Sequence, residues 1–241
     1  MVPPLILSKK EFMKDEFLYN GIVVVNKPSG MTSHDVVSRV RHIFRMKRVG
    51  HAGTLDPLAT GVLIVLLGRC TKLFKEFEAY DKGYKASMIL GTKTTTADIE
   101  GKILQQVDYS QVTREQFENI MQEFRGNILQ VPPMVSAIKV NGKRLYELAR
   151  KGIEVKREPR SITIHDLQLV DFILPRVTFY VECSKGTYVR QLAEDMAERL
   201  NNIACISEIE RTRVGPFHIE EAVALEDLGP AHVKLWNGTL R

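Results

Sequence analysis

A six-residue apolar run, Val62–Leu67, is the longest unbroken hydrophobic stretch in the chain. A membrane-crossing helix needs about 20 such residues, so the run predicts a buried strand and no membrane partner. A loop with glycines at positions 50, 53 and 61 leads directly into it. Because glycine permits tight backbone paths and the close approach of a ligand, the sequence predicts a tightly turning loop next to the hydrophobic core.

Strand and helix patterns alternate irregularly along the chain, which favours an α+β fold over a regular strand–helix repeat. At 241 residues, the chain suits one large domain or one domain with a small appendage. Besides the apolar run, strands are predicted for Ile22–Val25, Tyr84–Leu90, Ile162–Leu169 and Val177–Cys183. Apolar stripes predict helices that begin after Thr32 or Ser33, after Thr113 (a capping box with Gln116) and near Val189, and a shorter one over Arg144–Lys151.

Basic residues exceed acidic ones, 34 against 29, and gather in two clusters. The first cluster contains no acid and the second has few, and a phosphate-rich partner would relieve the repulsion within each. In the first helix the arginines at 41, 45 and 48 would form a row away from the apolar stripe, although a solvated helix face explains that spacing equally well. The candidate RNA-backbone contacts are Arg39, Arg41, Arg45 and Arg48 in the first cluster, and Lys139, Lys143 and Arg144 in the second.

The three cysteines, Cys70, Cys183 and Cys205, are odd in number and far apart in sequence. This pattern argues against a disulfide framework or a zinc cluster, and favours a reducing cytosol. The N-terminus lacks the basic start and long apolar core of a signal peptide. We therefore expect a cytoplasmic protein without a structural metal.

Asp56 is the only acid within ten residues of its own position, and Pro57 pushes it toward an extended backbone. A glycoside hydrolase needs two carboxylates, and no cluster of metal ligands surrounds this one. Spacing alone leaves a simple Asp-Pro turn as an open alternative.

Residues 50–61, GHAGTLDPLATG, resemble the signature of the TruB family of tRNA pseudouridine synthases, in which the aspartate is catalytic. Five further segments resemble motifs of that family in the same order, and together they extend from residue 21 to residue 217. They are GIVVVNKPSGMTSHD at 21–35, KGYKA at 82–86, TTTADIEG at 94–101, CSKGTYVR at 183–190 and IERTRVGPF at 209–217.

The resemblance implies a pseudouridine synthase fold, in which a mixed, mostly antiparallel sheet is flanked by helices and carries a central RNA-binding cleft. It implies isomerisation of uridine 55 in the T loop of tRNA, with no cofactor and no obligate protein partner. The catalytic domain would be residues 1–217. Residues 218–241 would be a tail that is too short for the C-terminal RNA-binding (PUA) domain of many relatives.

The resemblance also assigns roles to single residues. Asp56 would attack C1′ or the uracil ring of a flipped-out base, and Arg190 would pair with it. Tyr84, Tyr188, His51 and Ile209 would contact the base or fill its place in the RNA, and Lys27 and Asp98 would support the site. Glu210 stands where many members have a basic residue, which puts one RNA contact in doubt.

Two other functions remain open from the sequence. The first is a guide-RNA-dependent pseudouridine synthase, which would need protein partners. The second is a non-catalytic protein that binds or folds tRNA with the same cleft.

Overall fold

The computed structural model describes residues 19–136, 138–140, 142–149 and 152–236. These residues form an α+β fold with mostly antiparallel strands, which confirms the predicted class. The chain divides into two compact units, which we call unit 1 and unit 2. Unit 1 combines the residues up to Tyr80 with those from Arg211 onward, and unit 2 holds Asp81–Glu210. The predicted cleft stays a prediction.

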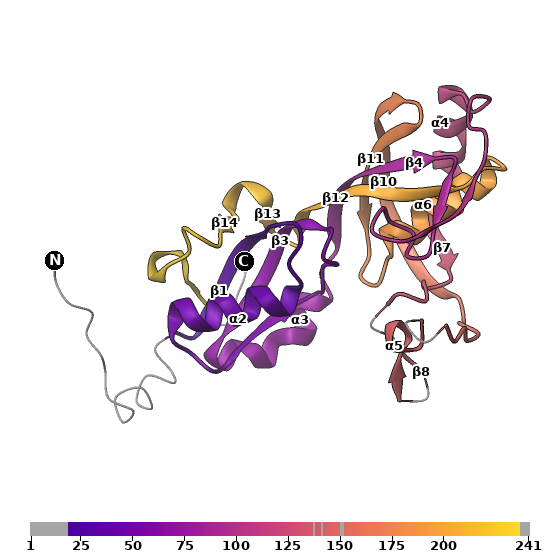
Figure 1. The fold of residues 1–241 in the computed structure, drawn as a ribbon. Helices are drawn as coiled ribbons and strands as arrows, with labels where there is room; N and C mark the ends of the chain where they lie inside the picture. The colour runs from indigo at the N-terminus through magenta and orange to yellow at the C-terminus, as the bar shows by residue number, and fades with distance from the viewer. Residues whose placement is uncertain (1–18, 137, 141, 150–151, 237–241) are drawn as a thin grey trace. The chain divides into compact units, whose positions relative to one another are not determined.

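Unit 1 is built around two long neighbouring strands (Figure 1). Its N-terminal elements are β1 (Gly21–Lys27), α2 (Ser33–Phe44), β2 (Val49–Ala52), β3 (Thr60–Leu67), η1 (Gly68–Leu73) and α3 (Phe74–Glu78). Its C-terminal elements are β13 (Phe217–His218), η2 (Ile219–Glu221), β14 (Val223–Ala224), η3 (Pro230–His232) and β15 (Lys234–Leu235).

The predicted apolar run forms β3, which is antiparallel to β1 on one side and to β2 on the other. Nearly every residue of β3 is buried, as expected for a strand with neighbours on both edges and apolar residues on both faces. The outer edge of β1 pairs with β14 in parallel and with β15 in the antiparallel sense. Residues from 218 to 236 thus add strands to unit 1, while the division into a catalytic domain and a tail stays a prediction.

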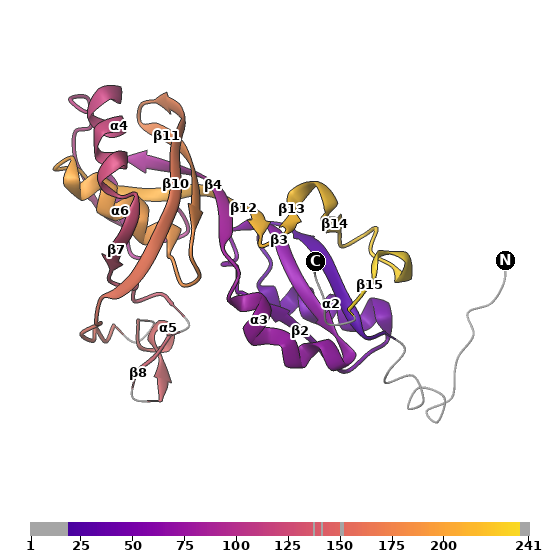
Figure 2. The same cartoon turned by 180° about the vertical axis from the view of Figure 1, so that it is seen from behind.

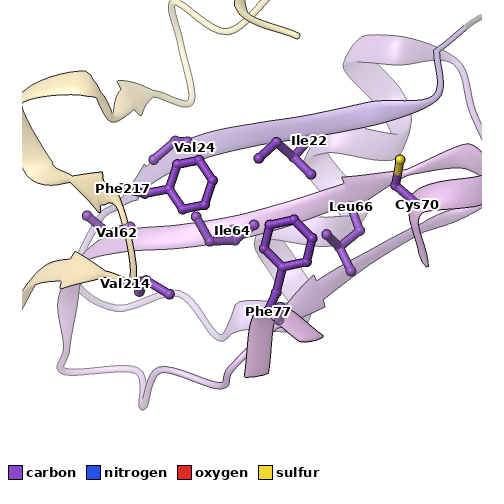
Figure 3. Packing of buried hydrophobic residues seen from close by; sticks show 10 residues of the cluster. Ile22, Val24, Val62, Ile64, Leu66, Cys70, Phe77, Val214 and Phe217 are labelled. Carbon is purple, nitrogen blue, oxygen red and sulfur yellow. The ribbon is translucent and has the colours of Figure 1, made fainter. Parts of the chain in front are cut away.

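An apolar cluster covers one face of β1 and β3 (Figure 3). Side chains of alternate strand residues, such as Ile22 on β1 and Ile64 on β3, point toward Phe77 of α3 and Phe217 of β13. The rings of Phe77 and Phe217 are stacked, with their centroids 6.1 Å apart. Residues from the N-terminal and C-terminal segments of unit 1 therefore share one core.

The helix α2 begins and ends at clear signals. Thr32 caps it in a reciprocal box with Asp35, which confirms the predicted start. The helix ends at Phe44, because Arg45 adopts a left-handed conformation with φ of 53°. The predicted helical row of arginines at 41, 45 and 48 is therefore wrong for Arg45 and Arg48, since both lie beyond the last residue of the helix.

Unit 2 contains the longer hairpins of the chain (Figure 2). Its elements are β4 (Lys82–Leu90), β5 (Thr92–Thr94), β6 (Ile103–Gln106), α4 (Arg114–Glu123), β7 (Gly126–Gln130), β8 (Lys139–Val140), β9 (Lys143–Arg144), α5 (Leu145–Ala149), β10 (Arg160–Ile173), β11 (Arg176–Cys183) and α6 (Val189–Arg199). The strands β4, β11, β10 and β7 lie side by side in that order.

The alternation predicted for Val177–Cys183 is confirmed on β11, whose odd-numbered residues are all buried. The capping box of Thr113 and Gln116 starts α4 as predicted. The short helix α5 begins one residue later than expected, because Arg144 belongs to the β8–β9 hairpin. Its predicted end at Lys151 lies outside the described residues.

The strand β12 (Ala204–Val214) joins the two units along the chain. Its residues 204–210 belong to unit 2 and its residues 211–214 to unit 1. Sequence patterns did not predict this strand, because charged residues interrupt the apolar alternation in its second half.

Candidate functional site

Asp56 lies on the loop that connects β2 to β3, within unit 1. Glycines with positive φ flank this loop: Gly53 at its start, with φ of 85°, and Gly61, the second residue of β3, with φ of 97°. The carboxylate-bearing residue is half-buried, and its neighbours Leu55 and Ala59 are buried. The loop is therefore anchored in the core on both sides of the aspartate.

Side chains of the segment at residues 21–35 hold the main chain on both sides of Asp56. Ser33 Oγ accepts a hydrogen bond from Leu55 N at 2.8 Å and donates one to Leu55 O at 3.1 Å. Beyond the aspartate, Ser29 Oγ donates to Leu58 O at 3.2 Å.

Lys27 lies completely buried at the end of β1. Its Nζ donates to the carbonyl oxygens of Pro28, Met31 and Pro57, at 2.8, 2.6 and 3.1 Å. An ammonium group has three protons, so these three acceptors can use them all. Lys27 thus joins residues 28–31 to Pro57, the residue that follows Asp56, and its role in supporting the site stays a prediction.

Arg211, in the IERTRVGPF segment at residues 209–217, contacts the same loop. The sequence analysis assigned no role to this arginine. Its guanidinium donates to three carbonyls of the β2–β3 segment, those of Gly53, Thr54 and Val62. The available signal was its position inside the IERTRVGPF segment. Asp56 O accepts a hydrogen bond from Ala59 N at 3.1 Å. Together with the contacts of Arg211, Ser33, Lys27 and Ser29, this means that every main-chain carbonyl from residue 53 to residue 58 accepts a hydrogen bond.

His51 lies on β2, opposite Val65 of β3. Burial lowers the pKa of its imidazole, and the nearby charges of Arg211 and His34 lower it further. The neutral form is therefore favoured. Its Nδ1 is buried and has no hydrogen-bond partner among the described residues.

Arg190 lies in the first turn of α6, within unit 2, and is only 5% exposed. It forms an ion pair with the buried Asp98, with 3.7 Å between Nη1 and Oδ2. The guanidinium also donates to Thr96 O at 2.5 Å and to Val135 O at 3.0 Å. Arg190 is therefore a buried, oriented cation and not a surface arginine.

The loop that carries Asp98 is itself well held. Asp98 Oδ1 accepts hydrogen bonds from Thr96 Oγ1 at 2.5 Å and from Glu100 N at 3.1 Å. A bridge to Ile206 of β12 ties this loop to the sheet. Asp98 is thus positioned to fix the guanidinium of Arg190.

The two tyrosines of the predicted site occupy different elements of unit 2. Tyr84 is largely buried on β4, opposite Val181 of β11. Tyr188 is the residue before α6, and its main chain exchanges two hydrogen bonds with the side-chain amide of the buried Gln130. Gln130 is a second contributor that sequence reasoning missed. Ile209 is half-buried on β12.

The basic residues of unit 1 differ in their surroundings. Arg39 and Arg45 are exposed. Arg41 is partly buried and donates to Val49 O at 3.0 Å, and Arg48 Nε donates to Thr71 Oγ1 at 2.9 Å. The last two side chains therefore brace β2 and η1, and the first two are the better candidates for RNA contacts.

In unit 2, the candidate residues of the second cluster lie on the β8–β9 hairpin. Lys139 is opposite Arg144 in the hairpin register, and Val140 is opposite Lys143. A short hairpin therefore carries all three basic candidates of this cluster.

The residues predicted for the site belong to different units. Asp56, His51 and Lys27 belong to unit 1, while Tyr84, Asp98, Tyr188, Arg190 and Ile209 belong to unit 2. The pairing of Asp56 with Arg190 therefore stays a prediction.

The described residues offer neither a cluster of metal ligands nor a membrane-spanning helix. The side chains of this part of the chain include no group of three or more His, Cys, Asp or Glu that could hold a metal ion. Within the same residues, no helix has the length and apolar character needed to span a bilayer.

The chain is similar to known pseudouridine synthases. The sequence model described as "TruB family pseudouridylate synthase (N terminal domain)" matches residues 41–189. A protein named "tRNA pseudouridine synthase B" from Clostridium tetani is 47% identical over 215 residues, which are 89% of this chain and 74% of that protein. A protein of the same name from Geotalea uraniireducens is 50% identical over 208 residues, 86% of this chain and 67% of that one.

A solved structure agrees with these relatives. A chain in "Crystal Structure of a Cbf5-Nop10-Gar1 Complex" superposes with a TM-score of 0.69 at 31% identity, covering 90% of this chain and about half, 54%, of that one. The family model covers more than half of the sequence, and relatives at least 47% identical span most of it. The chain therefore belongs to the TruB family of pseudouridylate synthases.

Proposed function

We propose that this protein converts uridine to pseudouridine at position 55 in the T loop of tRNA. The relatives named tRNA pseudouridine synthase B support tRNA as the class of substrate. The observation that carries the proposal is the Asp56 loop, whose backbone is held by Ser33, Lys27 and Arg211. A half-buried carboxylate on so rigid a loop suits a nucleophile that must meet one atom of its substrate.

The reaction is an isomerisation that needs no redox partner and no external group donor. The ionised Asp56 attacks the flipped-out nucleotide at C1′ or at the uracil ring. The N1–C1′ bond breaks, the uracil turns, and C5 bonds to C1′ as the aspartate leaves. The C5 proton is lost and N1 gains one, so that substrate and product have the same atoms.

Residues of unit 2 would bind the flipped-out base and stabilise the negative charge of Asp56. A base taken out of the RNA stack needs an aromatic face and hydrogen bonds to its edge. We assign the aromatic face to Tyr84 and a second contact to Tyr188. Arg190, held by Asp98, would pair with Asp56 and favour its ionised form. His51 would fill the gap left in the RNA, and Ile209 would form an apolar wall beside the uracil.

The partner would be the T stem-loop of tRNA, bound without a further protein. Phosphates would contact the exposed Arg39 and Arg45 of unit 1 and the basic β8–β9 hairpin of unit 2. Such contacts make binding fall steeply as the salt concentration rises. A cytoplasmic location agrees with this substrate and stays part of the proposal.

The test is to incubate the purified chain with an unmodified tRNA transcript, without guide RNA, and to map pseudouridine by chemical labelling or mass spectrometry. We expect modification at position 55 alone. The Asp56→Asn variant should bind tRNA within about threefold of wild type and form no pseudouridine. Pseudouridine formed by that variant would refute Asp56 as the nucleophile.

The same assay separates the other two functions. The chain is more similar to tRNA pseudouridine synthase B than to the Cbf5 chain, which was solved in a complex with Nop10 and Gar1, and this favours an enzyme that acts without protein partners. Turnover that required a guide complex would point to the guide-dependent type. Tight tRNA binding without any turnover would point to a binding or folding protein.

A further inference from the structure

Arg211 is among the most deeply buried side chains in the structure, with 1% of its surface exposed. Its three guanidinium nitrogens each reach a main-chain carbonyl oxygen. Nε lies 2.8 Å from Val62 O, Nη2 lies 3.1 Å from Gly53 O, and Nη1 lies 3.4 Å from Thr54 O. A buried guanidinium stays charged and is costly unless it is hydrogen-bonded, so these contacts explain how the fold tolerates it.

The three acceptors lie on opposite sides of Asp56 in the sequence. Gly53 and Thr54 precede the aspartate, and Val62 follows it inside β3. One planar, rigid group therefore joins the start of the loop to the strand in which the loop ends. A lysine, with a single flexible nitrogen, would not reproduce this fork.

The main chain of Arg211 also packs against the loop. A Cβ atom at Gly61 would lie 2.3 Å from Arg211 O, and Gly61 has a φ of 97°. Only glycine permits this approach. Burial is the main cause of the lowered pKa of the His51 imidazole, and the nearby charge of Arg211 lowers that pKa further.

We propose that Arg211 is a positioning residue for Asp56, which acts by locking residues 53–62 and not by binding RNA phosphate. The inference rests on the proposed function, since Asp56 must be the reacting group. Arg211 differs from Arg39 and Arg45, because its guanidinium is buried whereas theirs are exposed to solvent. Arg213, two residues further along β12, is half-buried and donates to Gly215 O, and so provides a matched control.

The test compares Arg211→Met, Arg211→Lys and Arg213→Met with wild type in single-turnover assays at saturating tRNA. Misplacing a catalytic group by about 1 Å can cost 100-fold in rate. We expect Arg211→Met to lose about that factor, Arg211→Lys to lose less, and Arg213→Met to stay within about threefold of wild type. The tRNA affinity and its salt dependence should not change in any of them.

Chemical rescue gives a readout that a general loss of structure would not produce. Methylguanidinium added to Arg211→Ala should occupy the vacated site and restore part of the rate, whereas it should leave Asp56→Asn inactive. The single tryptophan, Trp236, lies in unit 1 with its ring centroid 4.9 Å from that of Phe77. Its fluorescence therefore reports whether each variant has folded. If the methionine variant does not fold, the lysine variant and the rescue decide.

A wild-type rate in the folded Arg211 variants would overturn the inference. Weaker binding with a salt slope reduced by about one, at an unchanged rate, would show a phosphate contact instead. Absence of pseudouridine with the wild-type chain would refute the proposed function, which is a separate result from either of these.

Discussion

Ser33 and Leu55 exchange two hydrogen bonds through one hydroxyl group, 2.8 Å from Leu55 N and 3.1 Å to Leu55 O. Ser33 is the first residue of α2, and Leu55 immediately precedes Asp56. The hydroxyl satisfies both polar groups of a buried peptide segment. The start of this helix therefore sets the path of the loop that carries the proposed nucleophile.

Replacing Ser33 with alanine should lower the rate of pseudouridine formation about tenfold without changing tRNA affinity. The buried Leu55 N–H and C=O would lose this partner, at a cost of about 1–3 kcal/mol in the free energy of unfolding. Urea unfolding followed by Trp236 fluorescence and single-turnover kinetics measure the two effects. Ser38→Ala, at an exposed position of the same helix, is the control. Equal behaviour of the two variants would contradict the role of Ser33.

Replacing Arg39 and Arg45 with glutamine should weaken tRNA binding and reduce its dependence on salt. Each phosphate contact that is lost lowers the slope of log affinity against log salt by about one. The rate at saturating tRNA should stay unchanged, because neither side chain touches the Asp56 loop in the described contacts. Filter binding over a salt series measures the slope. Full affinity in the double variant would show that these arginines face away from the RNA.

The stability of the protein should fall below about pH 6.5 because of His51. Burial lowers the pKa of this imidazole below its ordinary value of 6.5, so the unfolded chain binds its proton at a higher pH than the folded chain does. The contribution is therefore complete above the unfolded pKa and is lost as the pH falls through the window between the two values.

The measurement is urea unfolding of wild type and His51→Gln at pH 7.5 and pH 5. The free energy of unfolding of wild type should fall on acidification relative to that of the variant. His42→Gln, at an exposed position, should behave like wild type. A pH-independent difference between wild type and His51→Gln would contradict the lowered pKa.

Local patterns predicted much of the fold. The capping boxes of Thr32 with Asp35 and of Thr113 with Gln116 depend on residues three positions apart, so the sequence alone shows them. The buried strand β3 follows from an apolar run that only a core can accommodate. The long strand β12 escaped prediction, because its charged residues find partners far away in the chain. Glu208 pairs with Arg176, and Arg211 bonds to carbonyls of the β2–β3 segment.

The sequence by itself indicated which loop carries the candidate nucleophile, because residues 50–61 resemble the TruB signature, whereas the spacing of Asp56 and Pro57 alone left a simple turn open. Only the tertiary structure decided which cations hold that loop. Lys27 bonds to Pro57, 30 residues away, and Arg211 bonds to Gly53, 158 residues away. A cation can leave water only where carboxylates or several carbonyls converge on it, and that convergence depends on how distant segments meet. Sequence spacing cannot show it, which is why the role of Arg211 emerged only from the folded chain.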